Sequence, residues 1–551
     1  MNNSATLSLS AVAIGWNYIE INMSLHIISV VILTSILSFI TLKKRRTLQT
    51  PTEKVIPLSE KSTEMLSYSD NIADPNYVPE KLRGHKYMAK SHASRIKGLL
   101  LQKTKDFDSA TTAIFIAGEE LEGVKYCDIH KHFRQNQYFY YLSGVNIPGS
   151  ALLYNLKNDK LTLFLPNIDE EDIMWSGEPM YPEAALKEFD VDEVLYYSEI
   201  SKIVTEDLKD YTILTTDTDN VHDAAIKSRL VTGNIDLFYA MDESRLIKDW
   251  YEIETIRRAC EISDNCHLAV MSSLPIELNE AHIEAEFGYH AARQGGRSLG
   301  YDPICCSGPA CGTLHYIKNT EDIKGKHSTL IDAGAEWRGY TSDVTRCFPI
   351  DGRYTKEHRE VYETVLDMQS QTMKGMKPGA SWDDLHLLAH EILIKHFLDL
   401  GIFKKEFTAE ELLKRRVSCA FYPHGLGHLI GLDVHDVAGS ANYEDPDPMF
   451  SYLRIRRPLE ENMVLTNEPG CYFNDYLIEH FLNKFPERAE TVDKDILAKY
   501  MYVGGVRIED DILVTKDGYE NLNKVTSDPD EIERIVTKGL SKSRSDFHVL
   551  A

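Results

Sequence analysis

Residues 329–350 read TLIDAGAEWRGYTSDVTRCFPI, and this stretch decides more about the fold than any other part of the chain. Two runs rich in apolar and β-branched residues flank a Trp-Arg-Gly turn, which is typical of an antiparallel hairpin. A turn centred between Trp337 and Arg338 would place Asp332 directly opposite Asp343. Like charges opposed at about 5 Å destabilise a sheet unless a positive group lies between them. The hairpin therefore predicts a divalent-metal pair bridged by two carboxylates. The alternative is a register shifted by one, with one aspartate facing solvent.

A second stretch, FYPHGLGHLIGLDVHD at 421–436, concentrates imidazoles and carboxylates. Three histidines and two aspartates fall within 13 residues: His424, His428, Asp433, His435 and Asp436. Neutral imidazole is a good ligand for Mn, Co, Zn or Fe, and the interspersed glycines let backbone approach a site closely. The Gly-x-Gly here is not a dinucleotide fingerprint, because the next glycine has the wrong spacing and no βαβ unit surrounds it. The stretch predicts a functional site rather than an isolated core histidine.

Two glutamates complete a possible ligand set. Glu468 follows the apolar run MVLTN and precedes a Pro-Gly pair that would end a strand. Glu509 begins three consecutive acids in GGVRIEDDILVT, so at least one is expected to point against the core-facing pattern. All could be ordinary strand-end acids. Together, four carboxylates and one imidazole form the oxygen-rich set that two divalent cations bind: Asp332, Asp343, His428, Glu468 and Glu509. Two metals about 3.5 to 4 Å apart generate a bridging hydroxide and polarise a carbonyl.

The motifs LIDAG, SDVTR, PHGLGH, TNEPG and GGVRIEDD occur in this order. On these motifs, over about residues 83–535, the chain resembles the pita-bread metallopeptidases (M24B type), and within them Xaa-Pro dipeptidase (prolidase) and aminopeptidase P. The resemblance implies that the five residues above bind two divalent ions, with Mn expected and Co or Zn admitted, and that the protein is a homodimer. The spacing of 41 between Glu468 and Glu509 resembles prolidase more than the compact bacterial aminopeptidase P. The adjacent Cys305 and Cys306 depart from the family pattern, where one cysteine is expected.

The same resemblance implies a mechanism. The bridging hydroxide attacks the carbonyl of an Xaa-Pro bond, Glu468 takes and relays its proton, and a metal stabilises the oxyanion. His315 and His435 match catalytic histidines that hold the substrate and the tetrahedral intermediate. Tyr301 and Arg507 match positions in or beside the substrate site. Arg454 matches the prolidase arginine that binds the substrate carboxylate, for which bidentate pairing is suited. The neighbouring Arg456 and Arg457 leave open that any of these arginines faces solvent.

Three functions remain in competition. The first is a dimetal peptidase that hydrolyses Xaa-Pro dipeptides. The second is an aminopeptidase P that releases the first residue of longer peptides with Pro second, and the discriminating feature is whether Arg454 and neighbouring loops close the carboxyl side. The third is a non-catalytic pita-bread binding module, which the complete ligand set argues against. Creatine amidinohydrolase fails the same test, because its site does not keep the carboxylates.

The pattern of the chain predicts an α+β protein with two folded domains. Residues 82–244 are expected to form an α/β domain like the creatinase and aminopeptidase P N-terminal domain, with strands near 113–117, 193–197 and 211–216 and a hairpin at 151–166. Residues 245–535 are expected to form a second domain, with helix pairs around a curved, mostly antiparallel sheet, and the resemblance implies that this is the pita-bread domain. Helices are predicted from about 250, from Asn279 to Gly295, and over 355–376 and 382–400, with strand-like segments dominating the remainder. Residues 47–81 are predicted to be a linker and 536–551 a tail.

The first 46 residues contain a possible membrane anchor. Residues 21–42 carry no charged side chain and precede Lys43–Arg46, a length sufficient to cross about 30 Å of hydrocarbon. The basic flank would leave everything after it in the cytosol. A cleaved signal peptide fits worse, because no positive n-region precedes the apolar stretch. A plain N-terminal extension, diluted by Ser, Thr and His, is the alternative, and Met23 is an alternative start.

Composition limits the compartment and the partners. The nine cysteines are odd in number and include no C-x-x-C pair, which is typical of free thiols in a reducing compartment. The catalytic part is therefore predicted to be cytoplasmic, with or without the anchor. A net charge of −25 opposes phosphate attraction, so nucleic acid is excluded as a main partner. Proline-containing di- or oligopeptides are the expected substrates.

Overall fold

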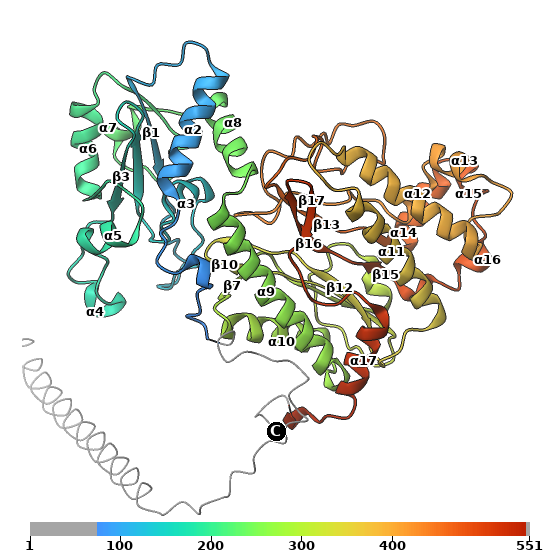
Figure 1. Ribbon diagram of the computed structural model, residues 1–551. Helices are drawn as coiled ribbons and strands as arrows, with labels where there is room; N and C mark the ends of the chain where they lie inside the picture. Colours follow the sequence, from blue (N-terminus) through green and yellow to red (C-terminus); the bar gives the residue numbers. More distant parts are fainter. Residues whose placement is uncertain (1–73, 547–551) are drawn as a thin grey trace, which may run out of the picture. The chain divides into compact units, whose positions relative to one another are not determined.

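The computed structural model describes residues 74–546 (Figure 1). The predicted anchor at 21–42 and most of the predicted linker lie outside these residues. Within the described part, no helix combines the length and apolar character that crossing a membrane requires. The end of the predicted linker already packs on helix α9 (Trp250–Ser273), since the ring of Tyr77 lies under the guanidinium of Arg258, 4.9 Å from the ring centre.

The N-terminal part is a six-stranded mixed sheet with the order β4-β3-β2-β1-β5-β6. Its strands are β1 (Thr112–Ala117), β2 (Ala151–Asn155), β3 (Lys160–Leu165), β4 (Glu193–Tyr196), β5 (Thr212–Leu214) and β6 (Leu230–Val231). The predicted hairpin is confirmed, because β2 and β3 pair antiparallel, as do β1 and β2, whereas the other pairs are parallel. Its larger helices are α2 (Ala89–Lys103), α3 (Gln137–Ser143), α5 (Pro182–Glu188) and α8 (Ile235–Leu246).

Helices cover both faces of this sheet (Figure 1). Side chains alternate along β1, so that Ile114 and Ile116 join the core under α2 and α3, while Ala113 and Phe115 join a second core. A strand buried on both faces reads as a continuous apolar run, which explains why TAIFIA shows no polar alternation.

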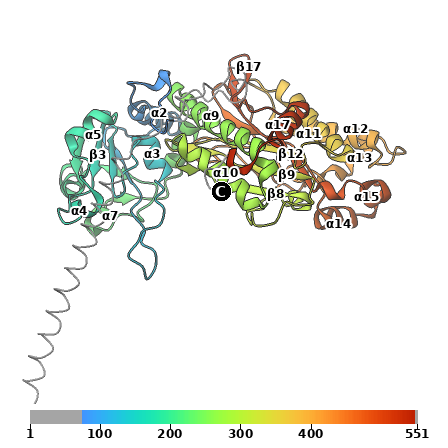
Figure 2. The same cartoon turned by 90° about the horizontal axis from the view of Figure 1, so that it is seen from below.

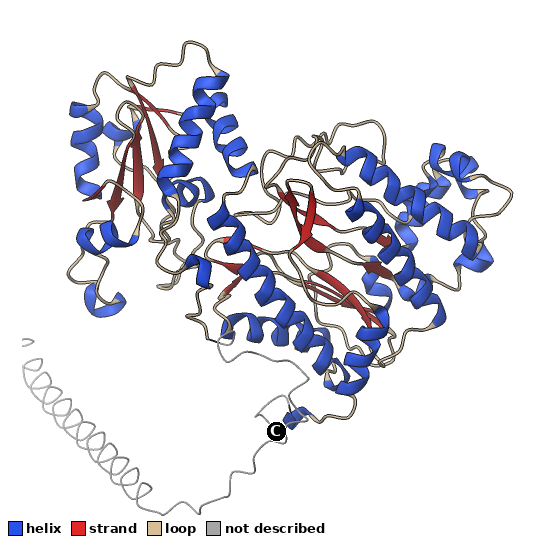
Figure 3. Cartoon of the chain, in the orientation of Figure 1, coloured by secondary structure: helices blue, strands red, loops and turns tan. Residues whose placement is uncertain are grey.

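The C-terminal part is built from short antiparallel strands between helix pairs (Figure 3). Its principal helices are α9 (Trp250–Ser273), α10 (Glu280–Arg293), α11 (Lys356–Lys374) and α12 (Trp382–Leu400). Helix α9 packs on α10, and α11 lies beside α12 (Figure 1, Figure 2). The predicted helix boundaries are confirmed where caps set them: Asn279 caps α10, and Ser381 and Gly401 bound α12.

The strands of this part form four small sheets, and every pair in them is antiparallel. They are β7 (Ser298–Leu299) with β10 (Ala335–Trp337) and β11 (Tyr340–Thr341); β8 (Ile304–Ser307) with β9 (Ser328–Asp332) and β12 (Thr345–Pro349); β13 (Val464–Asn467) with β16 (Asp510–Thr515) and β17 (Gly518–Asn521); and β14 (Gly470–Tyr472) with β15 (Gly505–Arg507). Isolated bridges pair Thr345 of β12 with Glu509, which lies between β15 and β16, and Leu429 with Leu465 of β13. The predicted fold class is confirmed.

The predicted register of the 329–350 hairpin is wrong. Trp337 pairs with Tyr340, so the turn residues are Arg338 and Gly339, and Asp332 pairs with Thr345. Both turn residues have positive φ, 50° and 79°, which is the geometry of a tight type I′ turn whose twist matches the strands. The shift moves Asp343 to a position diagonal to Asp332 on the same face, so the two carboxylates still meet.

Two other expectations need correction. Strand-like segments do not dominate after residue 400, because five helices follow: α13 (Ala409–Lys414), α14 (Asp475–Asn483), α15 (Pro486–Ala489), α16 (Lys494–Leu497) and α17 (Pro529–Gly539). These helices are short. Helix α14, for example, buries only Ile478 and Leu482, four residues apart on one face. Too few turns are present for a helical repeat to be visible in the sequence. Helix α17 also continues past the predicted end of the domain at 535, with Val536 fully buried.

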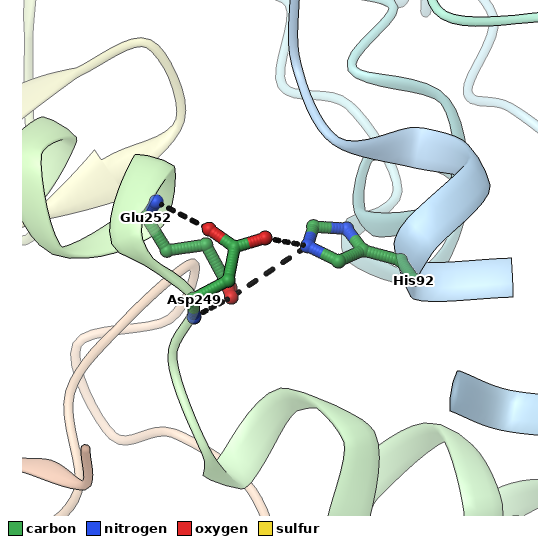
Figure 4. A group of neighbouring side chains, drawn as sticks. All are labelled: His92, Asp249 and Glu252. Carbon is green, nitrogen blue, oxygen red and sulfur yellow. Dashed lines mark hydrogen bonds and ion pairs between the residues drawn. The ribbon is translucent and has the colours of Figure 1, made fainter. Parts of the chain in front are cut away.

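A buried imidazole joins the N-terminal part to the first turn of α9 (Figure 4). Nδ1 of His92, on α2, lies 2.7 Å from the carbonyl oxygen of Tyr141, and Nε2 lies 2.9 Å from Asp249. Both neighbours only accept hydrogen bonds, so both ring nitrogens donate and the ring is an imidazolium. Burial lowers the pKa of His92, but Glu252 and Asp249 outweigh it and raise the pKa to about 9.

Candidate active site

One cavity of about 370 Å³ gathers almost all of the predicted site residues. The five expected metal ligands line it, and so do four other predicted residues: His315, His435, Arg454 and Arg507. Tyr301 is the exception. Its ring lines a neighbouring cavity of about 990 Å³, while its hydroxyl reaches the ligand carboxylates.

Strand pairing brings the acids together. Asp332 ends β9 and pairs with Thr345 of β12, and Thr345 also bridges to Glu509, which lies between β15 and β16. Asp343 precedes β12 on the same face as Thr345. Residues far apart in the chain therefore converge because one threonine is paired on both sides.

His428 and Glu468 approach from the opposite side. The backbone N–H of His428 donates to Thr466 Oγ1 on β13, and Glu468 follows the end of that strand. Nε2 of His428 then lies 3.4 Å from Asp343, 3.5 Å from Glu468 and 4.0 Å from Glu509. A single imidazole nitrogen thus faces three carboxylates, and Asp343, His428 and Glu509 form a group whose ligand atoms could hold one ion.

The crowded carboxylates of the cavity favour a bound cation. Burial and the neighbouring Asp332 raise the pKa of Asp343, and burial with Asp343 raises the pKa of Glu509. Oε1 of Glu509 is buried without a hydrogen-bond partner among the described residues. Burial lowers the pKa of His428 to about 3, so the imidazole is neutral and its nitrogen is free to ligate. Crowded carboxylates, an orphaned oxygen and a neutral imidazole fit divalent metal ions.

Further side chains hold these carboxylates in place. The Tyr301 hydroxyl lies 2.6 Å from Asp332 and within hydrogen-bond distance of Asp343, and it can donate its one proton to either carboxylate. Arg507 donates to Asp332 through Nη2 and to Thr345 through Nε. Tyr301 and Arg507 were predicted as substrate residues, and their contacts here are with the acids that line the site.

At least one of the three consecutive acids was expected to point against the core-facing pattern, and all three are buried. Glu509 faces the cavity, where it accepts from Thr345 at 2.6 Å. Asp510 pairs with the buried Arg346 at 2.6 Å, and Asp511 accepts the backbone N–H of Asp343. Each acid has a partner that is distant in sequence, which is why the local pattern did not predict their burial.

The structure separates the three neighbouring arginines. Arg456 pairs with Asp445 and Asp383, and Arg457 pairs with Glu243 and Glu460. Arg454 lines the cavity, and within the described residues it has neither a hydrogen-bond nor an ion-pair partner. Its guanidinium is therefore available to an anion in the cavity.

Two residues of the cavity region had no role assigned from sequence. His424 lines the cavity, and its Nε2 lies 2.8 Å from the hydroxyl of Tyr472, to which Arg507 also donates. The signal for His424 was its spacing of four from His428. The signal for Tyr472 was its position four residues after Glu468, at the end of the short strand β14. Residues an even number of positions apart on a strand share a face.

Comparisons with known proteins agree with this geometry. Residues 254–516 match the model of metallopeptidase family M24, and residues 92–214 match that of the aminopeptidase P N-terminal domain. An uncharacterized peptidase of Saccharomyces cerevisiae is 68% identical, covering 89% of this chain and 91% of the relative. The chain belongs to metallopeptidase family M24.

Other relatives of this M24 peptidase carry a more specific name. A probable Xaa-Pro aminopeptidase of Sclerotinia sclerotiorum is 42% identical, with 84% of each chain covered. Escherichia coli aminopeptidase P, solved with the inhibitor Pro-Leu, has a TM-score of 0.69 at 28% identity, covering 83% of this chain and all of that one. Proline aminopeptidase P II of Yersinia pestis gives 0.67 at 30% identity, with 82% and 99% covered. The resemblance to Xaa-Pro peptidases is thereby confirmed.

Proposed function

We propose that this M24 peptidase is an Xaa-Pro aminopeptidase, which releases the first residue of peptides whose second residue is proline. The observation that carries the proposal is the single cavity of about 370 Å³ that the five ligand-type side chains share with His315, His435 and Arg454. The names of the relatives support the peptide class. The exposed Tyr443 and Tyr452 on the cavity lining support substrates longer than a dipeptide, because the cavity reaches solvent there.

Asp332, Asp343, His428, Glu468 and Glu509 would hold two divalent ions, with Mn as the expected metal and Co or Zn also compatible with oxygen-rich ligation. When bound, the ions would activate water as the nucleophile and polarise the carbonyl of the scissile bond. The four carboxylates supply the negative charge that offsets two such ions.

Glu468 is the acid best suited to move a proton. Its side chain is 17% exposed, compared with 7% for Asp343 and 2% for Glu509, so it is more open to substrate than those two. Burial, partly offset by Arg507, raises the pKa of Glu468 to about 7. Bound cations would lower this pKa and keep the carboxylate ionised, as a general base requires. Glu468 would take the proton of the attacking water and pass it to the proline nitrogen.

The histidines would orient the substrate as neutral donors. Partial desolvation in the cavity and the neighbouring His428 lower the pKa of His435, and partial desolvation with Arg507 lowers the pKa of His315. A neutral imidazole donates a hydrogen bond to a developing oxyanion without adding charge to the site. Both residues line the cavity that holds the acids.

The second candidate is an Xaa-Pro dipeptidase, and Arg454 is the observation that favours it. A guanidinium without a partner in the described residues suits the carboxylate of a dipeptide, whose terminal proline would end within the cavity. The two candidates break the same bond and differ only in what may follow the proline.

A side-by-side assay tests both candidates. Purified full-length protein, loaded with Mn, is incubated with Gly-Pro and with a Pro-second tripeptide, and the released amino acid is quantified. Faster release from the tripeptide supports the aminopeptidase, and release from Gly-Pro alone would replace it with the dipeptidase. Hydrolysis of neither peptide by metal-loaded protein would refute both.

A further inference from the structure

Four buried or half-buried charges lie where helix α8 leads into α9. Arg245, near the end of α8, donates through one nitrogen to Asp433 and to Asp436, both at 2.6 Å. Lys248, in the connecting segment, donates to Asp436 at 2.8 Å and to the Arg245 carbonyl at 2.7 Å. The side chains of Arg245, Lys248 and Asp436 are 3%, 1% and 2% exposed. This network lies outside the cavity lining.

The two aspartates flank His435, a cavity residue. Asp433 precedes His435 by two positions and Asp436 follows it directly, so the arginine and the lysine hold the loop on both sides of the imidazole. The loop is closed by its own backbone, with Asp436 N–H donating to Leu429 at 2.9 Å and Gly431 N–H to Asp433 at 3.1 Å. The ring of His435 meets that of His428 at right angles, with centroids 4.5 Å apart.

The loop packs closely against the charged network at Gly431. A Cβ added at Gly431 would lie 2.3 Å from Oδ2 of Asp436 and 3.1 Å from Nζ of Lys248. The Gly431 carbonyl accepts from Thr341 N–H at 2.9 Å, which ties the loop to β11 on its other side. The carboxylate of Asp436 is therefore closely packed against Gly431, and the residue before it is His435.

The charges in this network depend on one another. Burial raises the pKa of Asp436, but Lys248 and Arg245 outweigh it and lower the pKa, so the carboxylate stays ionised. Removing one member of a buried ion network leaves an uncompensated charge, which displaces its surroundings. A network of this kind transmits a change in one side chain to the loop it holds.

We propose that Arg245 and Lys248 are positioning residues that set the place of His435 through Asp436 and Asp433. The inference rests on the proposed function, because His435 acts on the substrate there. A displacement of about 1 Å at a substrate-orienting group can lower turnover about 100-fold. The segment that connects the two folded parts thereby contributes to turnover without touching substrate.

A double-mutant cycle between Asp436 and His435 tests the proposal. In full-length, Mn-loaded enzyme, Asp436→Asn keeps the shape of the side chain and removes its charge, and we expect kcat to fall about 100-fold while KM changes less. Combined with His435→Ala, it should cost less than about 3-fold more than His435→Ala alone, because the two changes remove one function. Independent losses that multiply would overturn the proposal.

Two further variants serve as a replacement and as a control in this experiment. Arg245→Lys keeps the charge but shortens and reshapes the side chain whose Nη2 reaches both aspartates, and it replaces Asp436→Asn in the cycle if circular dichroism shows that the latter does not fold. Glu243→Gln, also on α8, removes one of the two ion-pair partners of Arg457 instead and should leave kcat within about 2-fold of wild type. An equal loss in Glu243→Gln would show general damage to the junction and contradict the proposal.

Crystal structures separate this inference from the proposed function. In Asp436→Asn, or in Arg245→Lys if that variant replaces it, the His435 ring should move by about 1 Å or more while the four acids and the His428 imidazole of the site remain in place. An unmoved ring refutes the inference even where wild type is active. A moved ring supports it even where wild type hydrolyses neither peptide, a result that would refute only the proposed function.

Discussion

Nε2 of His92 lies 2.9 Å from a carboxylate oxygen of Asp249, and this ion pair crosses from helix α2 to the N-cap of helix α9. The imidazolium is fully buried and carries a stacked tyrosine ring, that of Tyr141, at 4.1 Å. A charge in this position is tolerated because Asp249 and Glu252 both face it.

The proton on His92 makes stability depend on pH. Folding raises the pKa of His92 from 6.5 to about 9, so its stabilising contribution is complete below pH 6.5 and is lost as the pH rises through 9. We expect the free energy of unfolding to fall by up to about 3 kcal/mol between about pH 6 and pH 10 on this account. His92→Gln should be less stable at low pH and should lose this dependence, measured by urea denaturation at both pH values.

A surface imidazole provides the comparison. His396 pairs with Asp367 at 3.0 Å but is 32% exposed, so His396→Gln should leave the pH dependence of wild type intact. A wild-type profile that is flat between the two pH values would contradict the assignment of a buried imidazolium.

Asp343 should be essential for activity and dispensable for folding. Burial and the neighbouring Asp332 raise the pKa of Asp343, so its negative charge is unfavourable in the metal-free cavity. Asp343→Asn removes that charge, and the metal-free variant should therefore remain folded. Mn at about 100 times its dissociation constant stabilises a site that binds it by about 2.7 kcal/mol. We expect the melting temperature of wild type to rise with Mn, that of Asp343→Asn not to, and turnover of the variant to be undetectable.

An aspartate on the surface of α11 serves as the matched control for that experiment. Asp367→Asn should keep both the Mn-dependent rise in melting temperature and wild-type turnover. Full turnover by Asp343→Asn with Mn supplied would be incompatible with a metal-dependent reaction at this cavity.

Tyr301 should act on metal affinity. Its hydroxyl lies within hydrogen-bond distance of two ligand carboxylates, and loss of such a supporting donor weakens metal binding by about 10- to 100-fold. Tyr301→Phe should show this loss in calorimetric titration with Mn. Tyr316→Phe removes a hydroxyl that donates to the buried Glu280 at 2.8 Å, away from the cavity, and should bind Mn as wild type does.

Arg454 should discriminate between substrates by their carboxylates. Loss of a charge-assisted hydrogen bond is worth about 1.5 to 3 kcal/mol, so Arg454→Ala should raise KM by about 10- to 100-fold for the peptide whose carboxylate it binds. Arg456→Ala, whose ion pairs with Asp445 and Asp383 lie elsewhere, should not. The peptide affected, Gly-Pro or the tripeptide, identifies the length that the cavity selects, and equal effects of the two variants would remove Arg454 from the site.

Helix boundaries were accessible from the sequence because their determinants are local. Ser381 caps α12 through its own side chain, and Gly401 ends it with a positive φ of 80°, so the signals lie within a few residues of the element they bound. The short helices of 475–497 were missed because each exposes most of its surface and shows too few turns for a period to be seen.

The hairpin shows where local reasoning stops. The choice between two adjacent turn positions depends on whether Arg338 accepts a positive φ, and the sequence pattern around Trp337 is compatible with either register. The structure has the tighter turn, which pairs Asp332 with Thr345. The prediction that the Asp332 and Asp343 carboxylates lie close together is still correct, because Asp343 lies two residues before Thr345 and residues two apart on a strand share a face.

Sequence alone was sufficient to identify the ligand-type residues and the family, because these depend on which residues occur and in what order. Their convergence required the tertiary structure. Thr345 pairs with Asp332 on one side and bridges to Glu509 on the other. Further contacts to acids distant in the chain come from Arg346, Asp511 and Tyr301. The assignment of Arg454 to the cavity, rather than Arg456 or Arg457, likewise depended on which arginine finds its carboxylate elsewhere. Side-chain partners distant in sequence leave no local pattern, because only the packed fold brings their charges within reach.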